Sequence, residues 1–136
     1  MAFWFSESHT DKVKLEIMVD EQLYSQKSDY QKIDIFQSLE FGRILTLDDV
    51  ITVTEKDEFI YHEMIVHPAM AVHPEVRRVL VVGAGDGGAL RELSRYEDIE
   101  AIDLVEIDGM LVEACKTFLP STAVGYQDPR VTVHIQ

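Results

Sequence analysis

The stretch Val79-Leu-Val-Val-Gly-Ala-Gly-Asp-Gly-Gly88 decides the fold of this chain. Its first four residues form an unbroken aliphatic run, which is typical of a parallel strand buried on both faces. The glycines that follow predict a tight turn at Gly83, close backbone approach to a ligand at Gly85, and an open helix start at Gly87 and Gly88. Strand, glycine turn and helix in this order predict the first crossover of a doubly wound sheet.

The residues after the glycines continue the same alternation. The first crossover helix is expected to end near Tyr96, and residues 101–107 are predicted to form the second strand. Asp108 is a good cap for a second helix, and residues 130–135 are predicted to form the third strand. With right-handed crossovers, residues 77–136 become a partial Rossmann-like nucleoside-binding domain, the first half of a class I methyltransferase-like sheet.

The N-terminal part of the chain has the pattern of short strands. Four segments alternate apolar and polar side chains or form brief apolar runs: residues 13–19, 30–36, 44–47 and 50–53. Asp48-Asp49 between the last two predicts a turn. We therefore expect residues 1–54 to form a small antiparallel β domain, so that the whole chain is of the α/β class.

Between these two parts the sequence predicts a connecting helix and linker over residues 55–76. Thr54 is a good N-cap, and acidic side chains follow it in the first turn. The helix is expected to reach about Val66 and to end at Pro68, because proline lacks the backbone N–H that a helix interior needs.

Composition narrows the class of protein. The chain has 136 residues and a formal net charge of −13, which argues against nucleic acid as a partner because phosphate binding needs a basic face. The single cysteine, Cys115, excludes an internal disulfide and favours a reducing, cytoplasmic location. No apolar stretch is long enough for a membrane span, and the N-terminus lacks the pattern of a signal peptide, so no membrane partner is expected.

Two acidic residues indicate the kind of nucleoside. Glu106 follows the glycine turn by about 20 positions and closes the second strand, where a carboxylate hydrogen-bonds ribose hydroxyls. Asp86 lies inside the turn, where it would repel a pyrophosphate but attract an amine or a sulfonium cation. It would also repel the carboxylate of S-adenosylmethionine, so a decarboxylated donor fits it better. Asp86 can equally serve the start of the following helix.

A metal site is not expected. His62-Glu63 with His67 resembles part of a zinc motif, but the two histidines are five residues apart instead of four. On a helix that spacing separates them by roughly 140°. Cys115 is expected to be an inert buried thiol.

The third strand of the predicted sheet is the last element of the chain. In a doubly wound sheet, later strands pair on the far side of the first one, so residues 79–82 would otherwise form an exposed edge. We therefore expect 136 residues to be a portion of a longer chain, or one that a second chain completes.

The sequence resembles the spermidine synthases, or polyamine aminopropyltransferases, over essentially its whole length. The matching motifs are Trp4-Phe5, Ser28-Asp-Tyr30-Gln31, Phe41-Gly42, Leu45-x-Leu47-Asp48, Thr54-Glu-Lys-Asp-Glu-Phe-Ile-Tyr61-His62-Glu-Met64, the turn from Gly83 to Gly88, Val105-Glu106-Ile-Asp108 and Asp128-Pro-Arg130-Val. The resemblance implies a transferase of polyamine and spermidine biosynthesis. Putrescine would attack decarboxylated S-adenosylmethionine, a co-substrate, and spermidine and methylthioadenosine would leave; no other cofactor is implied.

The resemblance also implies roles for individual residues. Glu106 would hold the ribose, and Asp86 the aminopropyl ammonium. Gln31 would contact the donor from the N-terminal sheet. Tyr61 would orient or deprotonate the attacking amine, as the catalytic residue present here, and His62 would line the junction between the two substrates. Family members self-associate through the N-terminal region, so a homo-oligomer is expected.

Departures from the family leave alternatives open. Thr52 stands where the family commonly has a glutamine in the polyamine cleft. The family's catalytic aspartates would lie beyond Gln136, so the 136 residues alone are expected to be inactive. One alternative is a class I methyltransferase that uses S-adenosylmethionine. The other is a non-catalytic nucleoside-binding half of a split protein.

Overall fold

The protein divides into two compact units, Met1–Asp57 and Glu58–Gln136, in a computed structural model that describes residues 1–136. Each unit has its own hydrophobic core. The three-part division predicted from the sequence, with a separate connector at 55–76, stays a prediction. The helix within that segment packs in the second unit, against the helix that follows the glycine turn.

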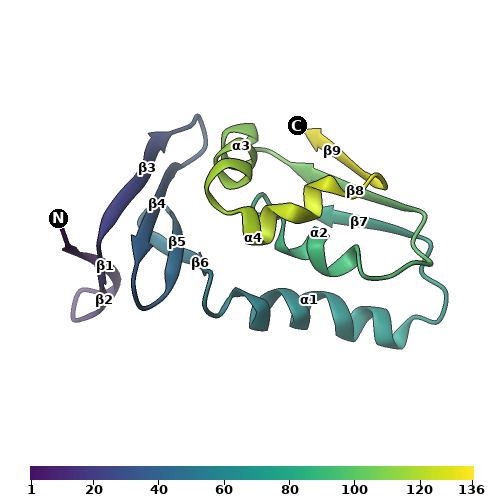
Figure 1. Ribbon diagram of the computed structural model, residues 1–136, viewed down its shortest axis with the longest axis horizontal. Helices are drawn as coiled ribbons and strands as arrows, with labels where there is room; N and C mark the ends of the chain where they lie inside the picture. Colours follow the sequence, from purple (N-terminus) through teal and green to yellow (C-terminus); the bar gives the residue numbers. More distant parts are fainter. The chain divides into compact units, whose positions relative to one another are not determined.

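The first unit consists only of antiparallel strands, as the sequence predicts. A hairpin of β1 and β2 accompanies a four-stranded sheet in the order β3-β4-β5-β6 (Figure 1). The strands are β1 (Phe3–Thr10), β2 (Val13–Val19), β3 (Glu21–Lys27), β4 (Lys32–Ser38), β5 (Gly42–Leu47) and β6 (Val50–Thr54). Their common core consists of Phe5, Ile17, Val19, Phe36 and Ile44.

Strands β1 and β3 were not predicted. In β3 no side chain is fully buried, so its sequence lacks the alternation of a half-buried strand. This strand is formed instead by its antiparallel pairing with β4. The predicted turn at Asp48 and Asp49 is confirmed, because both residues have positive φ angles, 49° and 63°, as a two-residue hairpin turn requires.

The second unit is a three-stranded parallel sheet, β7-β8-β9, with helices in its crossovers. The predicted first half of a Rossmann-like sheet is therefore confirmed. Its elements are α1 (Glu58–Val72), β7 (Arg78–Val82), α2 (Gly88–Leu93), β8 (Ala101–Glu106), α3 (Gly109–Phe118), α4 (Pro120–Ala123), the 3₁₀ helix η1 (Val124–Gln127) and β9 (Val131–Ile135). Asp108 caps α3 as predicted, because its carboxylate accepts hydrogen bonds from the N–H groups of Met110 and Leu111.

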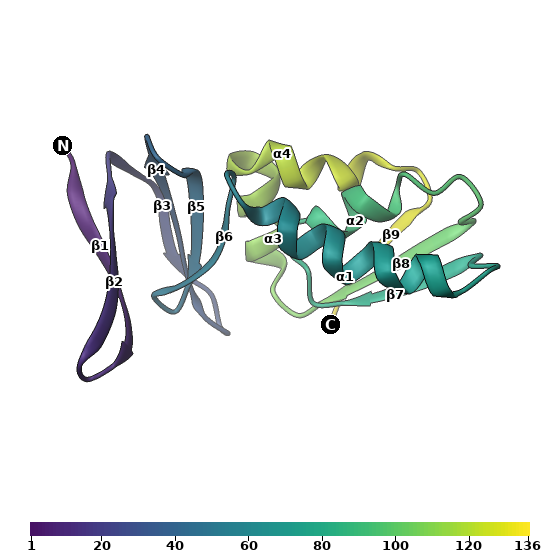
Figure 2. The ribbon, with the colours of Figure 1, turned by 90° about the horizontal axis from the view of Figure 1, so that it is seen from below.

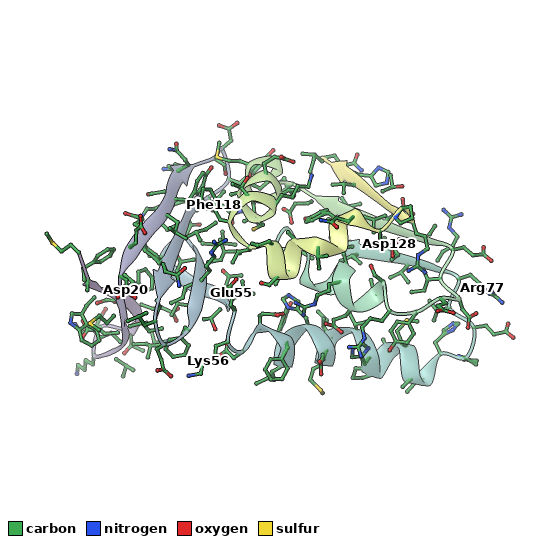
Figure 3. All side chains as sticks on the ribbon, in the orientation of Figure 1. Asp20, Glu55, Lys56, Arg77, Phe118 and Asp128 are labelled. Atoms are coloured by element: carbon green, nitrogen blue, oxygen red, sulfur yellow. The ribbon has the colours of Figure 1, made fainter.

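Helix α1 differs from the prediction at both ends. It begins at Glu58, because Thr54 pairs with Ile44 as the last residue of β6 and its hydroxyl donates to Asp57. Glu55 and Lys56, labelled in Figure 3, lie in the intervening turn. The helix also continues through Pro68 to Val72. Met70, beyond the proline, packs on the core of the unit, and this burial offsets the lost backbone hydrogen bond.

The sheet of the second unit is covered on one face only. Figure 2 shows the helices of this unit on one side of β7, β8 and β9. The expectation that residues 79–82 are buried on both faces is wrong for this chain, since Leu80 and Val82 are 65% and 74% exposed. Strand β7 also forms an edge of the sheet, as predicted.

The start of β9 is held by a salt bridge and a set of carbonyl contacts. Asp128, labelled in Figure 3, pairs with Arg130, whose guanidinium also donates to the carbonyls of Ser94, Tyr96 and Ile99. This links β9 to the loop before β8. None of the helices is long and apolar enough to cross a membrane.

Candidate active site

The candidate site lies at the carboxyl ends of β7 and β8, where ligands bind in open α/β sheets. The glycine loop, residues 83–88, leaves β7 there. Gly83 and Gly87 have φ angles of 63° and 86°, which residues with side chains rarely adopt. Two of the predicted loop glycines are therefore required by the backbone itself.

The other two loop glycines make room for neighbouring side chains. A Cβ on Gly85 would lie 2.7 Å from Cδ2 of Leu111 in α3, and a Cβ on Gly88 would overlap the ring of His62 in α1. Both close approaches are made within the protein. The predicted close approach of a ligand to the Gly85 backbone stays a prediction. At Gly88, the absence of a side chain makes room for the His62 ring.

Asp86 is the buried carboxylate of the loop, with 7% of its surface exposed. Its Oδ1 accepts a 2.7 Å hydrogen bond from the Gly88 N–H and lies 3.0 Å from Nε2 of His62. Burial opposes the charged form, but His62 and the Gly88 N–H outweigh it and lower the pKa of Asp86. Asp86 therefore contacts the first residue of α2, but the N-cap of this helix is Gly87, which makes no side-chain capping bond. The lowered pKa keeps Asp86 ionised at neutral pH.

His62 lies between two carboxylates and is 1% exposed. Nδ1 lies 2.5 Å from Oε2 of Glu58, and Nε2 faces Asp86. Burial disfavours the charged ring, yet the two acids raise its pKa above the ordinary value. Nδ1 forms a hydrogen bond with Glu58, and the Asp86 carboxylate lies close enough to Nε2 to form an ion pair with a protonated ring.

Glu58 and Arg91 complete this cluster, and neither was predicted from the sequence to be a site residue. The Arg91 guanidinium donates to both oxygens of Glu58, at 2.7 and 2.9 Å. Glu58 and His62 are four residues apart on α1, a spacing that places side chains on one helix face and could have revealed the pair. Arg91 could not be found in this way, because it lies 33 residues from Glu58.

A second cluster lies around Glu92. This carboxylate is 4% exposed and contacts Arg91, Arg95 and His67. Nδ1 of His67 lies 2.6 Å from the Tyr96 hydroxyl. The two histidines of α1 therefore contact different acidic partners.

Glu106 connects the ends of the two strands. It is 6% exposed, and its oxygens accept hydrogen bonds from the N–H groups of Ala84, at 3.2 Å, and Asp108, at 3.1 Å. One carboxylate therefore holds the glycine loop against the turn after β8. Its predicted contact with ribose stays a prediction.

A groove of about 650 Å³ runs between α1 and β7 to the glycine loop. Tyr61, His62, Gly83 and Asp86 line it together with apolar side chains of α1 and β7. Tyr61 is 59% exposed and lies edge-on to His62, with 5.2 Å between ring centroids. The second unit therefore brings together the predicted site residues Tyr61, His62, Gly83, Asp86 and Glu106. Gln31 lies in the first unit, just before β4.

Two further groups with a raised pKa are Tyr126, which contacts the glycine loop, and Cys115. The hydroxyl of Tyr126 donates to the carbonyl of Gly85, and Cys115 is fully buried. Burial raises the pKa of both groups, and the Asp86 and Glu106 carboxylates raise them further. The predicted inert thiol at Cys115 agrees with this environment.

The fold and the site define a class of protein: an antiparallel β unit followed by a Rossmann-like unit with an acidic glycine loop. Two family descriptions match this chain, the spermine/spermidine synthase domain over residues 58–136 and the spermidine synthase tetramerisation domain over residues 3–55. The chain belongs to the spermine/spermidine synthase family, which confirms the resemblance seen in the sequence.

Curated relatives and solved structures agree with this assignment. A polyamine aminopropyltransferase of Clostridium perfringens is 59% identical over the whole chain, and one of Alkaliphilus oremlandii is 55% identical. In each case this chain covers 48% of the relative. It therefore spans about half the length of the curated relatives that it matches.

Two solved structures match with 41% identity over 98% of the chain. One is spermidine synthase in complex with the transition-state analogue AdoDATO, with a TM-score of 0.96 and 46% of that chain covered. The other is spermidine synthase from Thermotoga maritima, with a TM-score of 0.95 and 48% covered. The methyltransferase-like fold predicted from the sequence is thereby confirmed.

Proposed function

We propose that the protein to which this chain belongs transfers an aminopropyl group from decarboxylated S-adenosylmethionine to putrescine. Spermidine and methylthioadenosine are the products. Family membership supports the reaction class, and a related spermidine synthase binds a transition-state analogue. Among the features of this chain, the observation that carries the proposal is the buried, ionised carboxylate of Asp86 inside the glycine loop.

The reaction is an in-line displacement. The amine nitrogen of putrescine forms a bond to the aminopropyl carbon beside the sulfonium, and the carbon–sulfur bond breaks. Methylthioadenosine leaves as a neutral thioether, and the new ammonium loses one proton. The protein contributes mainly by orienting the two partners and by accepting that proton.

Asp86 is suited to the cationic end of the donor. Its contacts with Gly88 and His62 both involve Oδ1, so we assign the other carboxylate oxygen, Oδ2, to the aminopropyl ammonium. A carboxylate in a buried site attracts an ammonium and repels the carboxylate of ordinary S-adenosylmethionine. This charge preference favours an aminopropyltransferase over the alternative of a methyltransferase.

The remaining predicted residues receive roles within the same proposal. Glu106 binds the ribose, and the exposed Tyr61 orients or deprotonates the attacking amine from the wall of the groove. Gln31 contacts the donor from the first unit, and His62 lies between the two substrates. The amine acceptor is proposed to be putrescine by resemblance to the family.

We also propose that the first unit mediates self-association, giving a homo-oligomer. Residues 3–55 match a tetramerisation domain, and the hairpin of β1 and β2 presents Trp4 beside Met18, with 63% and 48% of their surfaces exposed. The cytoplasmic location that the single cysteine favours stays part of this proposal, as does the expectation that no nucleic acid binds.

The test uses the full-length gene product that contains this chain. Methylthioadenosine release is measured with putrescine and either the decarboxylated or the ordinary donor, for the wild type, Asp86→Asn and the control Asp103→Asn. Asp103 is a carboxylate of β8 on the uncovered face, one-third exposed. We expect turnover only with the decarboxylated donor, and a KM for it at least about tenfold higher in Asp86→Asn alone.

Two results would overturn the proposal. Methyl transfer from S-adenosylmethionine would establish the methyltransferase alternative. Tight binding of methylthioadenosine without turnover of either donor would establish a non-catalytic nucleoside-binding protein.

A further inference from the structure

Glu58 is a buried carboxylate that the proposed reaction does not use directly. It is 7% exposed, and it lies on the first turn of α1. Arg91 of α2 binds both of its oxygens, and one of them also contacts Nδ1 of His62. A carboxylate held by two donors from a guanidinium has one orientation, so the atom that His62 meets is also held in place.

The surroundings of His62 leave its ring little freedom. Glu58 contacts one ring nitrogen from α1, and Asp86 faces the other from the glycine loop. Gly88 lies against the ring so closely that no side chain fits between them, and Tyr61 lies edge-on to it. The charged groups that face His62 are therefore Glu58 and Asp86, and Arg91 acts on it through Glu58. A rotated ring would lose both carboxylate contacts.

We propose that Glu58, fixed by Arg91, is a positioning residue that holds the His62 side chain against Asp86. The His62 ring, held in this way, fixes the orientation of the Asp86 carboxylate toward the ammonium end of the co-substrate. The second step of this inference rests on the proposed function, whereas the first concerns the protein without ligand. The pathway runs from Arg91 through Glu58 and His62 to Asp86, and each link is a contact of 3.0 Å or less.

Electrostatics supports this arrangement. A buried imidazolium needs an adjacent anion, and Glu58 and Asp86 together raise the pKa of His62. Arg91 in turn offsets the charge of Glu58. The protonated ring is paired with Asp86 Oδ1 across 3.0 Å, and Oδ2 is assigned to the incoming cation.

Glu92 provides a matched control. It is 4% exposed, and it too pairs with Arg91, at 2.9 Å, but it contacts His67 and not His62. Glu58→Gln and Glu92→Gln therefore each remove one buried charge beside the same arginine. Only the first changes the partner of His62.

The experiment uses the full-length gene product with ¹³C-labelled histidine. The NMR signal of His62 is assigned with His62→Gln, and its titration is followed without ligand. We expect Glu58→Gln to lower the pKa of His62 by about one to three units, the effect of an adjacent opposite charge. Glu92→Gln should leave that pKa unchanged. In kinetics, Glu58→Gln should raise the KM for the decarboxylated donor about tenfold at neutral pH, with a smaller change in kcat.

A third variant covers the case in which Glu58→Gln fails to fold. Arg91→Lys keeps the charge but loses the two-pronged contact, so Glu58 is held less firmly and the His62 pKa should change by less than in Glu58→Gln. Equal shifts of the His62 pKa in Glu58→Gln and Glu92→Gln would overturn the inference. An unchanged His62 pKa in both Glu58→Gln and Arg91→Lys would also overturn it. If the shift occurs but the wild type transfers no aminopropyl group, the positioning of His62 is supported and the proposed function fails.

Discussion

The carboxylate of Glu106 accepts a hydrogen bond from the backbone N–H of Ala84, 3.2 Å away, and so joins the end of β8 to the glycine loop after β7. Its other oxygen accepts from the N–H of Asp108. The residue proposed to bind ribose is therefore also part of the framework that shapes the loop. Ligand binding and loop stability should respond together when it is changed.

Glu106→Gln tests this double role. The amide group replaces one acceptor with a donor, so one of the two N–H groups loses its partner. We expect a loss of about 1–3 kcal/mol in the free energy of unfolding, together with weaker binding of methylthioadenosine. Denaturant unfolding and calorimetric titration would measure the two effects. Glu113→Gln, an exposed carboxylate of α3, should change neither quantity, and an unchanged stability in Glu106→Gln would contradict the argument.

Gly88→Ala tests whether the last loop glycine exists to make room for His62. The added methyl group would overlap the imidazole, so the ring must move, and we expect a destabilisation of about 1–3 kcal/mol. Gly109→Ala is the control, because its Cβ would lie 3.4 Å from the side chain of Ile135 and its φ is not positive. Thermal unfolding of both variants would decide the question, and equal melting temperatures would show that the contact is unimportant.

The charge pair of His62 and Asp86 predicts a defined pH dependence of stability. The folded-state pKa of His62 is raised above 6.5, so its contribution is complete below that pH and is lost as the pH rises through the raised value. The pKa of Asp86 is lowered below 3.8, so its contribution is present above that pH and is lost as the pH falls. The pair should therefore stabilise the protein most between these two values.

The measurement compares the wild type with His62→Gln by urea unfolding at several pH values. The difference in free energy of unfolding should be largest between pH 3.8 and 6.5 and should decline on the alkaline side. A difference that grows above neutral pH would mean that His62 is buried in its neutral form.

Trp4→Thr tests the role of the first unit in self-association. Trp4 lies opposite Met18 in the hairpin of β1 and β2, and both side chains are largely exposed. Threonine keeps the strand propensity but removes the aromatic surface, so we expect a smaller native mass by light scattering. Leu39→Ser, which removes an 89% exposed side chain from the turn before β5, should leave the mass unchanged. The same mass for all three proteins would place the interface elsewhere.

Much of the fold could be predicted from local sequence. The aliphatic run of β7, the glycine loop and the Asp108 cap each depend on residues close together in the chain, and all three were found. Strand β3 was missed because its side chains are mostly exposed, and only its pairing with β4 defines it. The start of α1 was misplaced because Thr54 suits both a helix cap and a strand end, and pairing with Ile44 decides between them.

The residues of the candidate site also fall into those that local sequence predicts and those that only tertiary packing brings together. Asp86 and Glu106 could be predicted because their places in a strand–turn–helix unit follow from spacing alone. Spacing alone could have paired Glu58 with His62 but not with Arg91, which lies 33 residues away on another helix. Glu58 is buried, and Arg91 reaches it because α1 packs on α2.

The sequence by itself determined the order of the elements, the acidic glycine loop and the family to which the chain belongs, since these depend on neighbours along the chain. Only the tertiary structure decided which acids face His62, why Gly88 must lack a side chain and which face of β7 is covered. Charge pairing and steric fit act through space, between residues as far apart as Glu58 and Arg91, so they exist only after the helices have packed.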